Sequence, residues 1–253
     1  MSMAQANFQT DSLLAFMVGF GEGVNDLKCS IHSMKLNAHV DTATHYFTKS
    51  IRILMDEYKP GTILVPDVHK VGAFLKSCKE PTTKMRHIGN TLTLINGNQE
   101  FSTPTHDHII SHATVDRALL ALDSAKQNNW KKIGNADLDC SGNLTMEQLR
   151  GLSSMTKVAG KDAPVSIKVA DGNMIITAGS KRGARMSREI EVDVSRNTSE
   201  ECETVFGSHL PKLIDIIPSG PVIFYMGNKS ALVLKHGEVA ATLILKHQEG
   251  VDA

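Results

Sequence analysis

The residues from Asp137 to Gln148 carry oxygen ligands at spacings that suit a calcium ion. Acidic side chains stand at the first and third positions of this stretch, Gly142 at the sixth and an apolar residue at the eighth, which is the spacing of an EF-hand calcium loop. The last position is Gln148, where such a loop needs a bidentate glutamate, and the sequence offers no second loop to pair with it. A calcium-binding regulatory or scaffold protein with its site at residues 137–148 is therefore one hypothesis for this chain.

Three histidines, His106, His108 and His112, lie near Asp107 and form a second set of potential metal ligands. A His-X-His pair with a third histidine nearby can hold zinc, but this stretch is polar and typical of a linker. The sequence contains no dinucleotide or phosphate-binding glycine loop, and neither the GxSxG nor the HExxH motif of hydrolases. We therefore predict a protein that is not an enzyme and that requires no metal or cofactor.

The overall composition is that of a globular protein with balanced charge. Of its 253 residues 41% are hydrophobic, and 27 basic residues balance 27 acidic ones. General attraction to nucleic acid is excluded, so a nucleic-acid surface would require local segregation of charge. The four cysteines are scattered without a CxxC pair, which favours reduced thiols. Without a signal-like start or a long apolar run, we expect a soluble, cytoplasmic protein, in the host cytoplasm if the source is viral.

Alternation of polar and apolar residues is the clearest structural pattern. In the segment 189–194 acidic residues alternate with branched apolar ones, which is typical of a half-buried strand. Similar segments, several of them joined by turns such as Asp171-Gly172-Asn173, predict antiparallel sheet in the second half of the chain. The further predicted strands are 165–169, 174–178, 222–226, 231–234 and 239–245.

Helical spacing interrupts the strands four times. It predicts helices at 10–20, 67–79, 145–159 and 209–217, the third beginning with a capping box made by Thr145 and Gln148. Each half of the chain has the same order of strand, helix, strands, helix and strands, which indicates an internal duplication. The polar stretch 106–135, which includes helical residues around 115–128, is the candidate linker.

This order of elements resembles that of DNA sliding clamps, most closely those of tailed bacteriophages and more distantly proliferating cell nuclear antigen. The segments 144–149, 166–176 and 220–225 look like clamp segments. The resemblance implies an α+β protein with two similar clamp domains, each made of antiparallel sheets with two helices on one face. Residues 1–106 and 136–253 would be the domains, and residues 107–135 the interdomain connector. It further implies a homotrimeric ring that encircles duplex DNA without sequence preference, tethers the replicative DNA polymerase and is opened by an ATP-dependent clamp loader.

A sliding protein needs attraction to phosphates without base readout, which cations on the inner helices would supply. Arg150, Lys157 and Lys161 would share one face of a continuous helix, since they lie seven and four residues apart. The charges of the four helical segments sum to only +1, which also fits ordinary solvated helix faces. The basic run that contains Arg185 and Arg188 could hold phosphates or acids of a neighbouring subunit, and the sequence leaves both open. The candidate DNA-facing residues are Lys70, Lys76, Lys79, Arg150, Lys157, Lys161, Lys212, Lys181 and Arg182.

Two protein contacts follow from the same resemblance. The strand 186–194 is expected to pair with the strand 99–106 of the next subunit, which would close the ring head to tail. A pocket on the outer face is expected to bind a short peptide of the polymerase or another partner. Its candidate lining residues are Met34, Leu36, Ile109, Ile110, Pro218 and Leu245.

Overall fold

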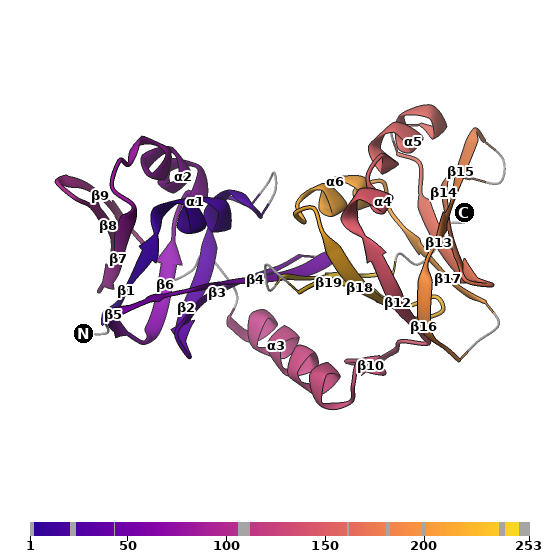
Figure 1. Cartoon of the computed structure of the whole chain (residues 1–253), viewed down its shortest axis with the longest axis horizontal. Helices are drawn as coiled ribbons and strands as arrows, with labels where there is room; N and C mark the ends of the chain where they lie inside the picture. Colours follow the sequence, from indigo (N-terminus) through magenta and orange to yellow (C-terminus); the bar gives the residue numbers. More distant parts are fainter. Residues whose placement is uncertain are drawn as a thin grey trace. The chain divides into compact units, whose positions relative to one another are not determined.

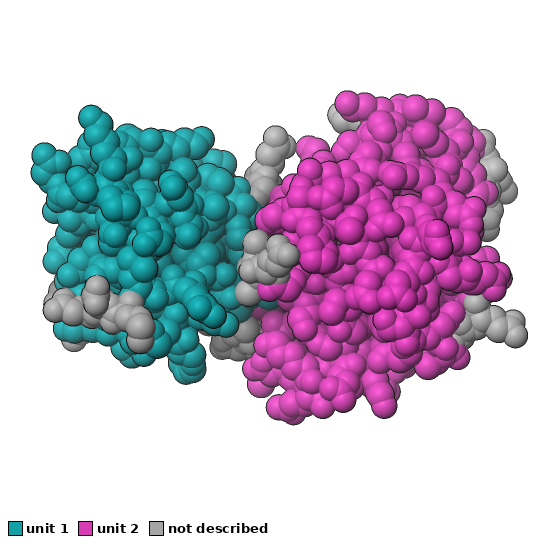
Figure 2. Space-filling model, viewed as in Figure 1, with its two compact units in different colours: residues 1–40, 47–115 teal, residues 41–46, 116–253 magenta. Residues whose placement is uncertain are grey.

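A computed structural model of the chain gives the fold. The structure describes residues 3–20, 24–42, 44–105, 112–160, 162–180, 183–198, 201–237 and 241–247, and it leaves the side chains of residues 41, 55–57 and 112–119 undescribed. Two compact units are present (Figure 2). Unit 1 comprises residues 1–40 and 47–115, and unit 2 comprises residues 41–46 and 116–253.

Unit 1 consists of antiparallel strands in two sheets with two helices (Figure 1). One sheet has the strand order β5-β1-β7-β8-β9, and the other strands follow the order β4-β3-β2-β6. Helices α1 and α2 pack against each other on one side of the sheets. The elements are β1 (Met3–Gln9), α1 (Thr10–Val18), β2 (Leu27–His32), β3 (Lys35–Asp41), β4 (His45–Arg52), whose first two residues count with unit 2, β5 (Leu54–Lys59), β6 (Gly61–Val65), α2 (Val68–Ser77), β7 (Thr82–Ile88), β8 (Thr91–Asn96) and β9 (Gln99–Pro104).

Unit 2 repeats this arrangement. Its strands pair in the orders β16-β12-β18-β19-β20 and β15-β14-β13-β17, which are the orders of unit 1 with every strand number raised by eleven. The elements are β12 (Cys140–Thr145), α4 (Met146–Leu149), α5 (Leu152–Ala159), β13 (Val165–Ala170), β14 (Asn173–Gly179), β15 (Arg185–Glu191), β16 (Asp193–Asn197), β17 (Cys202–Phe206), α6 (Leu210–Asp215), β18 (Pro221–Met226), β19 (Leu232–His236) and β20 (Ala241–Leu245). The predicted duplication and the α+β fold class are confirmed.

Local sequence accounts for several of these elements. The turn from β13 to β14 uses Asp171 and Gly172, both with positive φ, which is the geometry that a two-residue hairpin favours. At the start of α4 the hydroxyl of Thr145 accepts from the backbone N–H of Gln148, and the Gln148 side chain accepts from the backbone N–H of Thr145. The predicted capping box is therefore present.

Each unit has its own apolar core between its sheets and its helices. In unit 1 the side chains of Phe8, Leu13 and Phe16 are fully buried. In unit 2 the same holds for Phe206 and Phe224. Burying a side chain of this size stabilises the fold by about 2 to 3 kcal/mol, so the helices are held against the sheets mainly by this apolar contact.

The helix predicted over residues 145–159 is interrupted. The first helix, α4, ends at Leu149 with Arg150 as its C-cap, and α5 begins at Leu152, because Gly151 lies between them with φ of +91°. That φ is in the left-handed region, which ends a helix and is accessible to glycine at little cost. Arg150 and Lys157 therefore do not share the face of one continuous helix, and the prediction that they do was wrong.

A third long helix, α3 (His112–Gln127), occupies much of the predicted linker. It is followed by a short hairpin of β10 (Lys132–Ile133) and β11 (Ala136–Asp137). Leu122 and Ala125 of α3 pack with Val233 and Ile244 of the sheet. In unit 2, α3 lies on the face of the sheet opposite to α4, α5 and α6 (Figure 1).

Candidate nucleic-acid interface

The cations of unit 1 that were predicted to face DNA lie on and just beyond α2. Lys70 and Lys76 are exposed on this helix because Val68, Val71 and Leu75 turn its other face into the core. Lys79 is exposed after the helix end. Lys70 forms an ion pair with Asp67 at 2.9 Å, whereas Lys76 and Lys79 form none with the carboxylates that the structure describes. The two latter lysines therefore carry most of the available positive charge on this face.

Asp67 partly offsets the charge of Lys70. It caps α2 by accepting from the backbone N–H of Lys70, and its own backbone is left-handed with φ of 54°. Hydrogen bonds from the side chain and then the backbone of Lys70 lower the pKa of the Asp67 carboxyl. The carboxylate thus remains charged beside the lysine, and Lys70 is a weaker candidate for phosphate contact than Lys76.

Helix α1 contributes no cation to this side of unit 1. Its exposed residues are Asp11, Ser12, Ala15 and Val18. A lysine lies close to the helix, but it is Lys49 of β4, only 6% exposed, and its Nζ donates to the carbonyl of Ala15. The two units therefore present different electrostatic surfaces although their topology is the same.

In unit 2 the predicted cations are exposed but lie on separate short helices. Arg150 caps the end of α4, Lys157 is on α5, and Lys212 is on α6. Their side chains all reach solvent. The remaining candidates Lys161, Lys181 and Arg182 lie outside the described residues.

Arg188 is a cation whose role the sequence left open. It lies on β15, and its Nη1 donates to the carbonyl of Arg150 at 2.8 Å. The alternation of β15 indicated a strand, but it did not show that this arginine reaches the end of a helix nearly forty residues earlier in the chain. Only the packing of α5 against β14 and β15 brings them together.

The residues predicted to line a partner pocket have different environments. Leu36 and Leu245 are fully buried in the cores of their units and offer no surface to a peptide in this structure. This differs from the prediction because apolar residues on the inward face of a strand pack against the core. Met34, in the turn between β2 and β3, and Pro218, after α6, are partly exposed. Ile109 and Ile110 lie outside the described residues.

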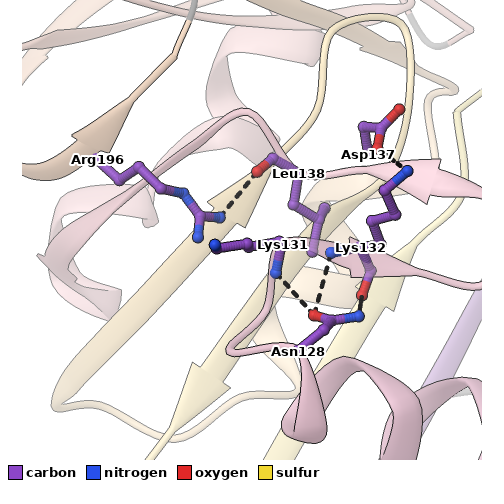
Figure 3. Close-up of polar contacts among 6 residues, drawn as sticks. All are labelled: Asn128, Lys131, Lys132, Asp137, Leu138 and Arg196. Carbon is purple, nitrogen blue, oxygen red and sulfur yellow. Dashed lines mark hydrogen bonds and ion pairs between the residues drawn. The ribbon is translucent and has the colours of Figure 1, made fainter.

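The calcium hypothesis is contradicted by the structure. Six of the twelve residues form β12, so the segment is a strand and not a loop. Asp137 pairs with Lys132 at 3.0 Å (Figure 3), and the carboxylate of Asp139 accepts from the backbone N–H of Asn228. Ser141, the fifth ligand position, is buried in the strand. Over the described part of the chain, no cluster of three metal-ligand side chains is present.

The zinc hypothesis concerns residues that the structure does not describe: His106, Asp107 and His108 are outside the described residues, as is the side chain of His112.

Polar contacts of the hairpin hold it in place. The Asn128 side chain accepts from the backbone N–H groups of Lys131 and Lys132 and donates to the carbonyl of Lys132 (Figure 3). Arg196 of β16 donates to the carbonyls of Trp130 and Leu138 at 2.7 and 2.8 Å.

An aromatic pair covers the sheet beneath the hairpin. The Trp130 ring stacks on Tyr225 with centroids 5.1 Å apart, and the Nζ of Lys235 lies 5.5 Å from the Trp130 centroid. Burial is the main cause that raises the pKa of the Tyr225 hydroxyl. The region after α3 is therefore a packed part of unit 2.

Among the strands at the ends of the described sheets are β9 and β15, each of which has one described partner. β9 pairs with β8 at one end of the five-stranded sheet of unit 1, and β15 pairs with β14 at one end of its sheet in unit 2. Six of the seven residues of β15 are exposed. A free strand edge carries unpaired N–H and C=O groups, which can bind another strand.

Comparison with known proteins identifies the fold but no family. No family model matches the sequence, and no curated protein matches it. The search of solved structures, in contrast, aligns almost the whole chain with clamp subunits. A protein of Eubacterium rectale assigned as a DNA polymerase III beta subunit aligns over 97% of this chain with a TM-score of 0.76 and 14% identity. The fold is that of a β clamp.

Two further structures agree. The DNA polymerase III beta subunit of Thermotoga maritima has a TM-score of 0.74 and 13% identity over 98% of this chain. The beta clamp of Helicobacter pylori, in complex with 3,4-difluorobenzamide, has a TM-score of 0.73 and 11% identity over 98%. The alignments cover 65% to 66% of the three clamp chains, so this chain spans slightly less than two thirds of their length. Within the described residues, no helix has both the length and the apolar character of a membrane span.

Proposed function

We propose that this chain is a DNA sliding clamp of the tailed-phage type, similar to proliferating cell nuclear antigen. Three copies form a closed ring around duplex DNA and tether a DNA polymerase, and a separate ATP-dependent loader opens the ring. The protein has no catalytic activity of its own in this proposal. The observation that carries it is the duplicated β-clamp topology, with two helix positions on one side of the sheets in each unit.

The charge distribution supports a sliding role over sequence recognition. The exposed cations Lys76, Arg150, Lys157 and Lys212 all lie on the helices or at their ends. Cations of this kind bind phosphates, which carry no sequence information. The net charge of zero means that electrostatic attraction alone is weak, so stable association requires enclosure of the DNA.

The free strands support ring assembly. Strand β15 of one copy pairs with β9 of the next, and the same contact repeated three times closes the ring. Light scattering is expected to give a mass about three times the 27.5 kDa of one chain. Ser187→Pro on β15 removes one backbone donor at this edge and is expected to lower the mass to that of one chain. The surface control is Lys229→Ala in an exposed turn, which keeps every backbone donor of β15 and is expected to leave the mass unchanged.

Retention on DNA tests enclosure directly. The ring is loaded on nicked circular duplex DNA with a loader and polymerase from the same source, and the DNA is then cut once. Retention on the circle and release after linearisation are expected, because a ring can slide off an end. Equal retention on circular and linear DNA, or a strict monomer at all concentrations, would refute the proposed function.

A further inference from the structure

Two arginines of unit 2 meet on the helix side of the sheet. Arg188 lies on the same face of β15 as Ile190, which is buried at 5% exposure, since residues two apart in a strand share a face. Across the ladder it stands opposite Ile176, which is also buried on this face. The Arg188 side chain extends past them, and its Nη1 donates to the carbonyl of Arg150 at 2.8 Å. The two residues, here called the arginine pair, are both exposed.

The backbone at the end of α4 accommodates this contact. Gly151 follows Arg150 with positive φ, and a Cβ at this position would lie 3.6 Å from the Nη1 of Arg188. The turn therefore leaves the carbonyl of Arg150, the C-cap of α4, open to Arg188 on β15. A cation is favourable at a helix C-terminus, and the hydrogen bond fixes the orientation of the Arg188 guanidinium.

Nearby carboxylates do not neutralise the arginine pair. Neither arginine has an ion pair with the acids that the structure describes. Glu147, three residues before Arg150, directs its Oε2 to the backbone N–H of Gly220. Glu189 and Glu191 lie on the other face of β15 from Arg188, because they are an odd number of residues away.

We infer that the arginine pair binds the phosphate backbone of duplex DNA, with Arg188 as a contact contributed by a strand in addition to those of the helices. This inference rests on the proposed function. A guanidinium offers five donors, of which the described contact with Arg150 uses one, so a planar fork remains for phosphate oxygens. Because the guanidinium is already held, it loses less conformational freedom on binding than a mobile lysine.

The test compares two arginines of the same strand. Arg188→Gln removes the proposed contact, and Arg185→Gln is the matched control, because Arg185 lies on the opposite face of β15 and the charge change is the same. Binding without enclosure is weak, so binding to a short duplex of random sequence is measured by fluorescence anisotropy with up to about 100 μM protein, over about 50 to 200 mM salt. Arg188→Gln is expected to reduce the slope of log K against log salt by about 0.9 and the affinity near 100 mM by about tenfold. Arg185→Gln is expected to leave both unchanged.

Two more variants separate binding from a structural role. Arg150→Gln keeps the carbonyl that Arg188 contacts and removes only a side-chain charge, so it is expected to reduce the slope as Arg188→Gln does. Arg188→Lys keeps the charge and is expected to retain the slope with a smaller loss of affinity. Equal slopes for Arg188→Gln and Arg185→Gln would overturn the inference. So would a wild-type slope for Arg150→Gln, a slope for Arg188→Lys as low as that of Arg188→Gln, or wild-type chain that does not bind the duplex.

Arg188 could instead stabilise the contact between copies, and the mass of the ring tests this explanation. If Arg188→Gln lowers the mass by light scattering and Arg185→Gln does not, Arg188 belongs to the contact between copies, and the inference is overturned. Failure of the proposed function has a different result, because wild-type protein would then be retained equally on circular and linear DNA. If the wild type is retained only on circular DNA and all arginine variants bind the short duplex equally, the inference about the arginine pair is rejected and the proposed function stands.

Discussion

Lys49 makes the stability of unit 1 depend on pH in a way that one substitution can isolate. Its side chain is buried at 6% exposure, and its Nζ donates to the carbonyl of Ala15 at 2.8 Å. The Nζ also lies 6.0 and 5.9 Å from the ring centroids of Phe16 and Phe20. No described carboxylate pairs with it. Burial lowers the pKa of the Lys49 ammonium from 10.5 to about 8.

The direction of the effect follows from proton linkage. Below pH 8 the ammonium is charged in both the folded and the unfolded chain, and the full cost of burying the charge is present. Between pH 8 and 10.5 the folded chain releases the proton first, so the unfolded chain binds more protons and stability rises with pH. With these two pKa values, the free energy of unfolding is expected to increase by about 2.5 kcal/mol between pH 7 and pH 10.

Lys49→Met removes this titration and keeps an unbranched side chain of similar length. The free energy of unfolding is measured by urea denaturation of both proteins at several pH values between 7 and 10. Relative to the variant, the wild type is expected to gain about 2.5 kcal/mol over this range. Burial also raises the pKa of the Cys29 thiol, which lowers stability at high pH, but both proteins share this residue and it cancels in the difference.

The matched control is Lys76→Met, which removes the same charge from the exposed face of α2. Its stability is expected to follow the wild-type pH profile. A constant difference between wild type and Lys49→Met from pH 7 to 10 would refute the reasoning, because it would mean that the buried amine keeps its ordinary pKa.

Three further substitutions test the packing and capping by thermal or urea unfolding. Asn96→Ala is expected to cost about 3 kcal/mol, and a cost below about 1 kcal/mol would contradict its hydrogen-bond network. The two hydrogens of the buried amide are shared among the hydroxyls of Thr10 and Thr83 and two carbonyls, and its oxygen accepts from the Glu80 backbone. Gly142→Ala is expected to cost more than about 2 kcal/mol, since a Cβ would collide with the carbonyl of Asp193 and the ring of Phe224, and wild-type stability would show that the strands adjust freely. Thr145→Ala removes the α4 cap and is expected to cost about 1 kcal/mol, whereas Thr145→Ser should restore most of it.

Most strands of unit 2 could be predicted because their patterns are local, but the segment 189–194 belongs to two strands, since β15 ends at Glu191 and β16 begins at Asp193. Segments 165–169, 174–178 and 222–226 each lie within a strand of the structure. Alternation reports which side of a strand is buried, and the Asp171-Gly172 turn reports where a hairpin forms. The same holds for the capping box at Thr145, whose two partners are three residues apart.

The site residues were less predictable because their environments depend on distant segments. Helical periodicity at 145–159 did not reveal the break at Gly151, since a single glycine is tolerated inside a helical pattern. The EF-hand spacing of residues 137–148 was equally misleading, because strand pairing with β16 and β18 decides the conformation of that segment. Leu36 and Leu245 are apolar, as the lining of a peptide pocket would be, but the identity of a residue does not show whether its side chain is buried in the core.

The sequence by itself determined most strands of unit 2, the duplication and the absence of strong net charge, all of which follow from short-range periodicity and counting. Only the tertiary structure decided that α3 covers the sheet of unit 2, that Lys49 is buried under α1, and that Arg188 reaches Arg150. The physical reason is that burial, desolvation and hydrogen bonding depend on which segments meet, and pairs such as Lys49 with Ala15 are far apart in the chain.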